Sequence, residues 1–137
     1  MFLTVRMLRI LIADDHPAVR RSLRSLVQTH ADWDVCGEAF DGIDAVEKAK
    51  ALRPDVVLLD LSMPNMNGIE ATPLIHQAVP QSEILIVSQY DSPELTRLVT
   101  DAGAQGYVPK SQVWSQLLPA IESASLRQSG IDAPRHS

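Results

Sequence analysis

Cysteine and long apolar runs are both scarce in this 137-residue chain. Cys36 is the only cysteine, which excludes an internal disulfide and leaves no cysteine spacing for a zinc site. The longest apolar runs have the length of a strand and fall far short of a membrane span. Met1–Arg6 also lacks the apolar core of a signal peptide. These absences predict a soluble cytoplasmic protein that has no membrane partner.

An excess of positive charge is absent as well, since the formal net charge is -5. This balance argues against a broad nucleic-acid-binding surface on the domain alone. The composition is 45% hydrophobic and 21% charged, which is typical of a globular rather than a disordered chain. A chain of this length predicts one domain with a sizeable core.

Short apolar segments alternate with segments of helical periodicity along the chain. The predicted strands are Leu8–Ala13, Val35–Ala39, Asp55–Asp60, Glu83–Ser88 and Tyr107–Pro109. The first predicted helix begins at Pro17, and the next three cover Gly42–Leu52, Ile69–Val79 and Pro93–Ala102. Ser111 is predicted to cap the last helix, which continues to about Leu126. Pro73 and Pro119 are expected to distort the helices that contain them. Trp33 is expected to pack where the first helix leads into the second strand.

Strands without in-and-out alternation are typical of a parallel sheet that is covered on both faces. The predicted fold class is therefore α/β, a three-layer doubly wound domain with five parallel strands. Functional sites in such sheets form beyond the carboxyl ends of the strands. That edge is predicted to bring together five residues from four strand ends: Asp14, Asp15, Asp60, Ser88 and Lys110.

Carboxylates that converge in this way suit a hard divalent cation, and Mg²⁺ is the predicted cofactor. If Asp14 and Asp15 hold the metal, Asp60 is free to act as a nucleophile that accepts a phosphoryl group. Lys110 supplies a positive charge and Ser88 a hydroxyl for the oxygens of that group. The less specific interpretation of Asp14 and Asp15 is an acidic turn that begins a helix, and Asp60 and Lys110 weigh against it.

Several motifs resemble those of CheY-like receiver domains of two-component response regulators, and most closely the NarL/FixJ-type subfamily. The motifs are ADDHPAVR, VCGEAFDG, PDVVLLDLSMPNMNGIEAT and DAGAQGYVPKS, and the resemblance extends from about Leu8 to Leu126. It implies the flavodoxin-like strand order 2-1-3-4-5. It further implies that a histidine kinase or phosphotransfer protein phosphorylates the domain, which then signals by a conformational switch.

The resemblance also implies a role for each motif residue. The implied roles are phosphoacceptor for Asp60, metal ligands for Asp14, Asp15, Asp60 and the backbone carbonyl of Ser62, switch residues for Ser88 and Tyr107, and active-site lysine for Lys110. Tyr107 has a plainer interpretation as a half-buried aromatic. His16, His30, His76 and His136 have no ligand spacing and are expected at the surface.

The expected organisation is an N-terminal extension at residues 1–7, the receiver at 8–127 and a polar tail or linker remnant at 128–137. One alternative is the receiver half of a transcription regulator whose helix-turn-helix domain is missing from this chain. A second is a phosphatase with an aspartyl nucleophile, but those enzymes typically place a second acid where Ser62 stands. A third is a receiver that no longer takes phosphate. The receiver is expected to catalyse only its own phosphoryl transfer and dephosphorylation, so it is not predicted to be an independent enzyme.

The last helix and its neighbours are the predicted output surface. Val113, Leu117 and Ile121 recur at helical spacing and should face the core, whereas Trp114 lies about 100° away and should be exposed. An exposed tryptophan is a good anchor for a partner or a second copy, and the plainer alternative is that Trp114 only covers the edge of the sheet. The resemblance implies a homodimer through the fourth helix, fifth strand and last helix.

Overall fold

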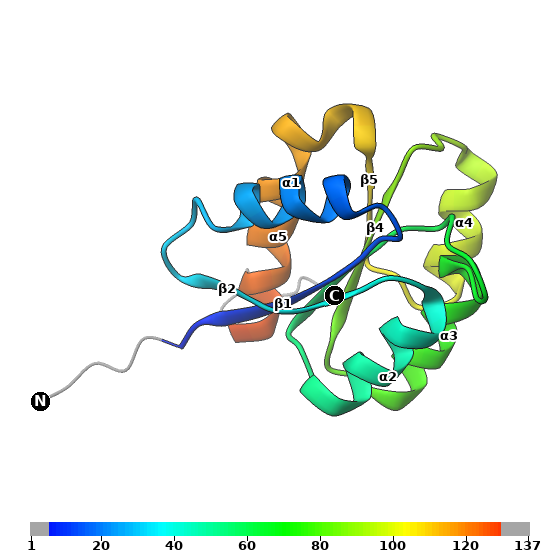
Figure 1. Cartoon of the computed structure of the whole chain (residues 1–137), viewed down its shortest axis with the longest axis horizontal. Helices are drawn as coiled ribbons and strands as arrows, with labels where there is room; N and C mark the ends of the chain where they lie inside the picture. Colours follow the sequence, from blue (N-terminus) through cyan, green and yellow to red (C-terminus); the bar gives the residue numbers. More distant parts are fainter. Residues whose placement is uncertain (1–5, 130–137) are drawn as a thin grey trace, which may run out of the picture.

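The computed structural model describes residues 6–129 and contains a five-stranded parallel sheet with strand order β2-β1-β3-β4-β5 (Figure 1). The strands are β1 (Leu8–Ala13), β2 (Trp33–Ala39), β3 (Val56–Leu59), β4 (Glu83–Ser88) and β5 (Gly106–Pro109). The helices are α1 (Pro17–Val27), α2 (Gly42–Leu52), α3 (Gly68–Ala78), α4 (Pro93–Asp101) and α5 (Val113–Ser129), and the 3₁₀ turn η1 (Lys110–Gln112) precedes α5. The predicted fold class and strand order are confirmed.

Helices cover both faces of the sheet, and each face has its own core. The core on the α1–α5 side contains Ile10 and Ile12 of β1, and the core on the α2–α3–α4 side contains Leu11 and Ala13 of the same strand (Figure 1). Because both faces are covered, successive residues are apolar along most of β1, β3 and β4, which is the pattern that the sequence shows.

Side-chain caps fix where three of the helices begin. Asp41 accepts a hydrogen bond from the N–H of Asp44 at 2.7 Å, and Ser92 accepts one from Leu95 at 3.3 Å. Asn67 and Glu70 form a reciprocal capping box at the start of α3. Arg53 ends α2 in the left-handed conformation, with φ of 48°.

The structure corrects the start of the last helix. Ser111 lies inside the 3₁₀ turn η1 rather than at a helix cap, and α5 begins at Val113. The prolines do not interrupt their helices: α3 continues through Pro73 and α5 through Pro119. Proline removes one backbone donor from a helix, and both of these helices keep their remaining bonds on either side.

The outer parts of the chain lie mostly outside the described residues. Of the expected N-terminal extension only residues 6–7 are described, and of the expected tail only 128–129. In the described part of the chain, no helix is both long enough and apolar enough to cross a membrane.

Gly68 packs directly against the end of β3, where the candidate nucleophile Asp60 lies. A Cβ atom at Gly68 would lie 2.2 Å from the backbone oxygen of Asp60 and 2.8 Å from Cα of Leu61. The Gly68 N–H also donates to the Leu61 carbonyl at 2.9 Å. Only a residue without a side chain fits between α3 and this strand end.

We expect Gly68→Ala to lower the free energy of unfolding by about 1–3 kcal/mol, because backbone atoms must move to admit the methyl group. Urea denaturation of the two proteins measures this difference. Gly37→Ala is the matched control, since its Cβ would meet mainly the flexible end of the Leu52 side chain and should cost less. Equal losses in the two variants would contradict the tight contact at Gly68.

Candidate active site

The carboxyl ends of the strands carry the predicted site residues. Asp14 and Asp15 follow β1, Asp60 follows β3, Ser88 ends β4, and Lys110 follows β5. The Asp60 N–H donates to the Ala13 carbonyl at 2.9 Å, which fixes Asp60 beside the acidic pair. Ser88 pairs with Pro109 across the sheet, so the hydroxyl residue and the lysine come from neighbouring strand ends. The predicted convergence at this edge is therefore present.

Lys110 lies between two buried carboxylates. Its Nζ atom is 2.8 Å from Oδ2 of Asp14 and 3.5 Å from Oδ1 of Asp60. The side chains of Asp14 and Asp60 are only 1% and 2% exposed, so solvent screens these charges weakly. One ammonium group thus faces two carboxylates, and the cluster retains an excess of negative charge.

Three carboxylate oxygens in this cluster are buried and lack a regular hydrogen bond, although Lys110 forms ion pairs with two of them. They are Oδ2 of Asp14, Oδ1 of Asp15 and Oδ1 of Asp60. Ligand atoms of Asp14, Asp15, His16 and Asp60 all lie within 4.8 Å of one another. Buried oxygens that lack donors are costly unless a cation binds them. The donor set therefore fits a small divalent cation.

The environment of Asp60 favours its neutral form. Burial, followed by the negative charge of Asp14, raises the pKa of Asp60 to about 6. The Lys110 charge and the Ser62 backbone N–H act in the opposite direction, because both stabilise the carboxylate. At neutral pH the carboxylate form predominates, and it carries an electrostatic cost that a bound cation would reduce.

The two expected switch residues lie at the β4–α4 connection. The hydroxyl of Ser88, a fully buried residue, accepts a hydrogen bond from the Tyr90 N–H at 3.1 Å. Tyr107 is half-buried, packs against the core and donates its hydroxyl to the Tyr90 carbonyl at 2.5 Å. Tyr90 therefore joins the two residues. Ser62 is exposed two residues beyond Asp60, and the role of its carbonyl stays a prediction.

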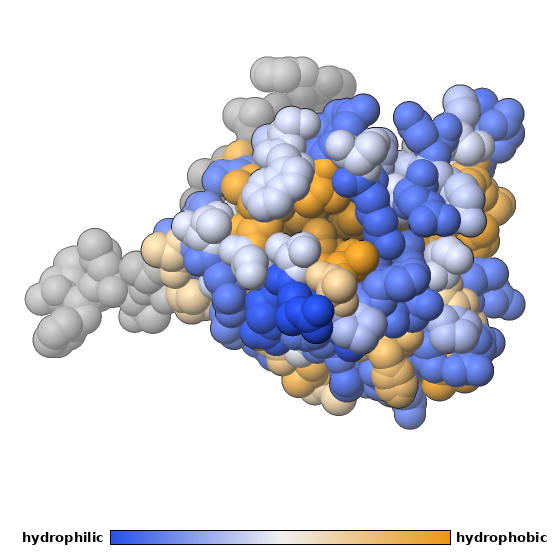
Figure 2. Space-filling view, turned by 45° about the horizontal axis from the view of Figure 1, so that its top comes forward, coloured by the Kyte–Doolittle hydropathy of each residue, from blue (hydrophilic) through white to orange (hydrophobic). Residues whose placement is uncertain are grey.

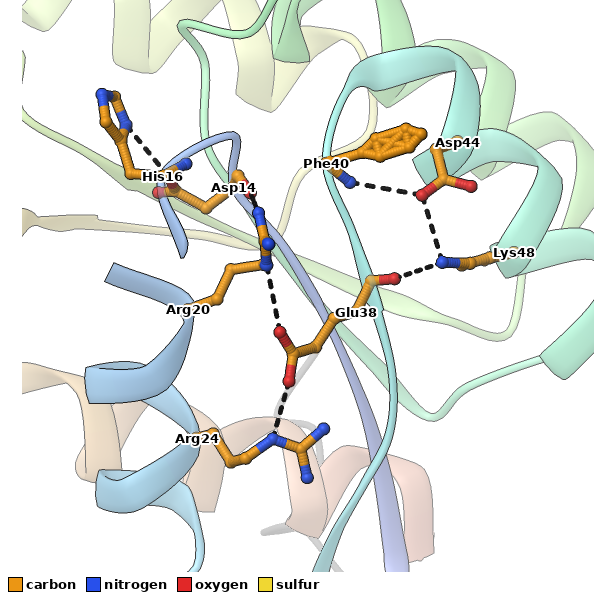
Figure 3. Close-up of polar contacts among 8 residues, drawn as sticks. All are labelled: Asp14, His16, Arg20, Arg24, Glu38, Phe40, Asp44 and Lys48. Carbon is orange, nitrogen blue, oxygen red and sulfur yellow. Dashed lines mark hydrogen bonds and ion pairs between the residues drawn. The ribbon is translucent and has the colours of Figure 1, made fainter. Parts of the chain in front are cut away.

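A polar network that the sequence analysis missed supports the acidic loop. Arg20 of α1 donates to the Asp14 carbonyl at 2.6 Å and to Glu38 of β2 at 3.0 Å (Figure 3). Arg24, one turn further along α1, donates to the other oxygen of Glu38 at 2.7 Å. The signal available in the sequence was two arginines four residues apart on a helix, which share one face.

Two of the four histidines have contacts that the sequence analysis missed, and the expectation for His136 lies outside the described residues. The side chain of His16 is 64% exposed, as expected, but its Nδ1 atom lies 3.1 Å from Oδ1 of Asp15 and 3.3 Å from Oδ1 of Asp14. It therefore borders the acidic cluster, although the sequence shows no ligand spacing. His76 is only partly exposed, and its Nδ1 atom is buried without a hydrogen bond. Helix packing against Gly103 covers it, and no local pattern signals that contact.

Trp114 is 80% exposed, as predicted, but the residues beside it belong to α1 and not to the predicted output surface. Trp114 lines a hollow of about 280 Å³ between α1 and α5, where Leu23 and Leu26 contribute apolar walls and Lys110 is also part of the lining. Figure 2 shows the apolar interior of this hollow in orange. Leu117 and Ile121 are buried as predicted, and Val113 packs against the core while partly exposed. Trp114 thus belongs to the α1 side of α5.

Comparison with known proteins agrees with this geometry. The family model of the response regulator receiver domain matches residues 10–122. The chain belongs to the response regulator receiver family. The receiver is similar to the signal receiver domain of the response regulator NarL from Mycobacterium tuberculosis, with 30% identity, a TM-score of 0.82 and coverage of 88% of this chain and 98% of that one. It is also similar to a LuxR-family response regulator from Aurantimonas sp. SI85-9A1, with 35% identity, a TM-score of 0.83 and coverage of 90% and 86%.

Longer relatives match the receiver over only part of their length. The transcriptional regulatory protein YxjL of Bacillus subtilis (strain 168) is 39% identical over 118 residues, which are 86% of this chain and 54% of that protein. The response regulator VraR of Staphylococcus saprophyticus is 33% identical over 126 residues, which are 92% of this chain and 60% of that protein. The predicted likeness to NarL/FixJ-type response regulators is confirmed by these NarL and LuxR-family relatives. The receiver spans about half the length of the curated relatives.

The raised pKa of Asp60 gives a stability test without metal. A pKa raised from 3.8 to about 6 favours the folded state below pH 3.8, and this contribution is lost as the pH rises through 6. Asp60→Asn removes the ionisation, so it should be more stable than the parent at pH 7.5, by up to about 3 kcal/mol at roughly 1.4 kcal/mol per pKa unit. The advantage should shrink steadily as the pH falls to 4.5.

Urea denaturation in a chelator measures both proteins across this pH range. Asp55→Asn is the matched control, because Asp55 is also buried but accepts hydrogen bonds from Arg6 and the Arg9 N–H. Asp55→Asn should not stabilise the protein at pH 7.5 or at pH 4.5. A pH-independent effect of Asp60→Asn would contradict the electrostatic explanation.

Proposed function

We propose that this receiver is a phosphorylation-controlled switch in which Asp60 accepts a phosphoryl group from phosphohistidine on a histidine kinase or phosphotransfer protein. The observation that carries the proposal is the buried Asp60 beside Lys110 and the acidic pair, whose negative charge exceeds the one positive charge of Lys110. An Asp60 oxygen forms the new bond to phosphorus while the bond between phosphorus and histidine nitrogen breaks. The histidine nitrogen keeps that electron pair, and Asp60 becomes an acyl phosphate.

The neighbouring side chains have distinct parts in this step. Lys110, which already faces Asp60, neutralises charge on the phosphoryl oxygens, and Ser88 offers its hydroxyl to one of them. Ser88 then exchanges its present contact with the Tyr90 N–H for the phosphoryl group. Because Tyr107 also holds the Tyr90 backbone, this exchange reaches the surface of β5 and α4. A change at these residues is the proposed conformational switch.

We propose Asp14, Asp15, Asp60 and the Ser62 carbonyl as the ligands of Mg²⁺. When bound, the ion would offset the charge of the carboxylates and of the incoming phosphoryl oxygens. Asp15 is well suited to bind the ion, because 28% of its side chain is exposed and can exchange water for the metal. Asp14 is already held by Lys110. The proposal assigns the domain no independent enzymatic reaction on another substrate.

Two surfaces are proposed for partners. Lys110 lines the hollow beside Trp114 and also contacts Asp60, so a protein that presents phosphohistidine there would lie close to Asp60. The homodimer is proposed through α4, β5 and α5, where Leu98 of α4 and Tyr90 at the preceding loop are 49% and 46% exposed. Tyr90 is hydrogen-bonded to both switch residues, so self-association would depend on phosphorylation.

A second candidate function follows from the lengths of the relatives. YxjL is named as a transcriptional regulator, and the receiver matches 54% of it. The same sequence would then be the receiver half of a DNA-binding regulator, with DNA contacts made outside this domain. The net charge of -5 supports the view that the receiver itself does not bind nucleic acid. A cytoplasmic location is part of both proposals.

We expect acetyl phosphate to add one phosphoryl group to the receiver in the presence of Mg²⁺ and none in the presence of a chelator. Intact-mass spectrometry detects the mass increase. Asp60→Asn should abolish labelling, and Asp55→Asn, which changes a buried acid at the opposite end of β3, should retain it. Equal labelling of the Asp60→Asn protein would overturn the assignment of the phosphoacceptor.

We expect beryllofluoride with Mg²⁺ to promote self-association of the receiver, and Leu98→Ala to weaken that association about tenfold or more, because an apolar anchor is lost. Sedimentation velocity of both proteins measures the change. Trp114→Ala is the control, since Trp114 lies on the α1 side of α5 and should leave self-association unaltered. The opposite ranking of the two variants would move the dimer to the α1–α5 surface.

A further inference from the structure

His16 is placed as a metal ligand would be, although the proposed function of the domain requires no imidazole at this position. Its Nδ1 atom lies 3.1 Å from Oδ1 of Asp15 and 3.3 Å from Oδ1 of Asp14. We infer that His16 is an additional metal-binding side chain, which lets the acidic site take late first-row transition-metal ions such as Co²⁺ or Zn²⁺ through an imidazole ligand. This inference rests on the metal site of the proposed function.

The distances fit one coordination shell. Oxygen and nitrogen ligands lie about 2.1 Å from such ions, so neighbouring ligand atoms in octahedral or tetrahedral shells are about 3.0–3.4 Å apart. The two separations between His16 and the acidic pair lie inside that interval. A cation could therefore contact the ring nitrogen and both Oδ1 atoms with little movement of the side chains.

The site keeps these atoms separate from Lys110. Lys110 faces the other oxygen of Asp14, Oδ2, at 2.8 Å, while Oδ1 of Asp14 faces His16. The backbone N–H of His16 also donates to Oδ1 of Asp14 at 2.9 Å, which fixes the loop in this arrangement. A cation at His16 therefore does not have to displace the lysine from its nearest partner.

The imidazole is accessible, and its described polar contacts are with the two acids that would share the cation. His16 is the N-cap residue of α1, but its side chain makes no capping hydrogen bond. With 64% of the side chain exposed, the ring can turn toward a cation, and water can complete the coordination shell. The buried oxygens of Asp15 and Asp60, which lack regular hydrogen bonds, supply the negative charge that makes such a shell favourable.

Ligand chemistry decides which ions respond to His16. Mg²⁺ strongly prefers oxygen and gains little from a ring nitrogen, whereas imidazole suits Co²⁺, Ni²⁺ and Zn²⁺. Carboxylates alone also bind these later ions more tightly than Mg²⁺, so a higher affinity by itself proves nothing about His16. The informative quantity is how much each affinity changes when the imidazole is removed.

The test is calorimetric titration of tag-free receiver with Co²⁺ and with Mg²⁺ at pH 7.5, together with the visible absorption spectrum of the Co²⁺ form. His16→Asn removes the imidazole and keeps a residue that caps helices well. We expect Co²⁺ to bind at least about tenfold more weakly to His16→Asn, since even indirect partners of a metal ligand are worth 10–100-fold. The Mg²⁺ affinity should change less than twofold, and the Co²⁺ spectrum should lose its nitrogen-ligand character.

His30→Asn is the matched control, because His30 is partly exposed but stacks on Trp33 and contacts Glu122 away from the acids. It should leave Co²⁺ binding unaltered. If His16→Asn bound Co²⁺ as tightly as the parent and kept the same spectrum, the inference would be overturned. Mg²⁺ binding by the parent would still leave the proposed function intact. Failure of Mg²⁺ to bind the parent would instead count against the proposed function, and a loss of Co²⁺ affinity in His16→Asn would still support the inference.

Discussion

The contact on which the site depends is that of Lys110 with two buried carboxylates. An ammonium group 2.8 Å from Asp14 and 3.5 Å from Asp60 makes a shielded acidic cluster tolerable without making it neutral. Complete neutralisation would leave no electrostatic gain for a bound cation. Burial, followed by the charge of Asp14, raises the pKa of Asp60 to about 6, and the cluster remains more negative than Lys110 alone can offset. The same imbalance thus costs stability and creates the capacity to bind.

The parallel sheet makes this cluster possible. Residues far apart in the chain share one edge because β1, β3, β4 and β5 run in the same direction and end together. Close packing then fixes where β3 ends relative to β1, through the hydrogen bond from the Asp60 N–H to Ala13 and the contact of Gly68 with the end of β3. The apolar strands supply the rigidity, and the polar residues at their ends supply the chemistry.

Local patterns predicted what depends on local chemistry. Apolar runs predicted the strands, and polar residues at the ends of those runs predicted the acidic site and Lys110. The start of α5 was wrong because η1 places Ser111 inside a 3₁₀ turn, and a single capping residue cannot distinguish the two arrangements. The side of α5 that Trp114 occupies depends on how the helix is rotated against α1, which helical spacing alone does not fix. The contacts of Arg20 and His16 with the acids likewise depend on tertiary placement, so no spacing rule revealed them.

The link from the Asp14 carbonyl through Arg20 to Glu38 has a consequence for protein engineering. The acidic turn is short, but a helix and a second strand hold its shape. Transplanting residues 13–17 into another parallel-sheet scaffold would carry the carboxylates and leave behind the guanidinium that supports their backbone. A transferable module would have to include Arg20 and Arg24 together with a glutamate on the adjacent edge strand. The smallest portable unit is therefore β1, α1 and β2 together, rather than the turn that bears the acids.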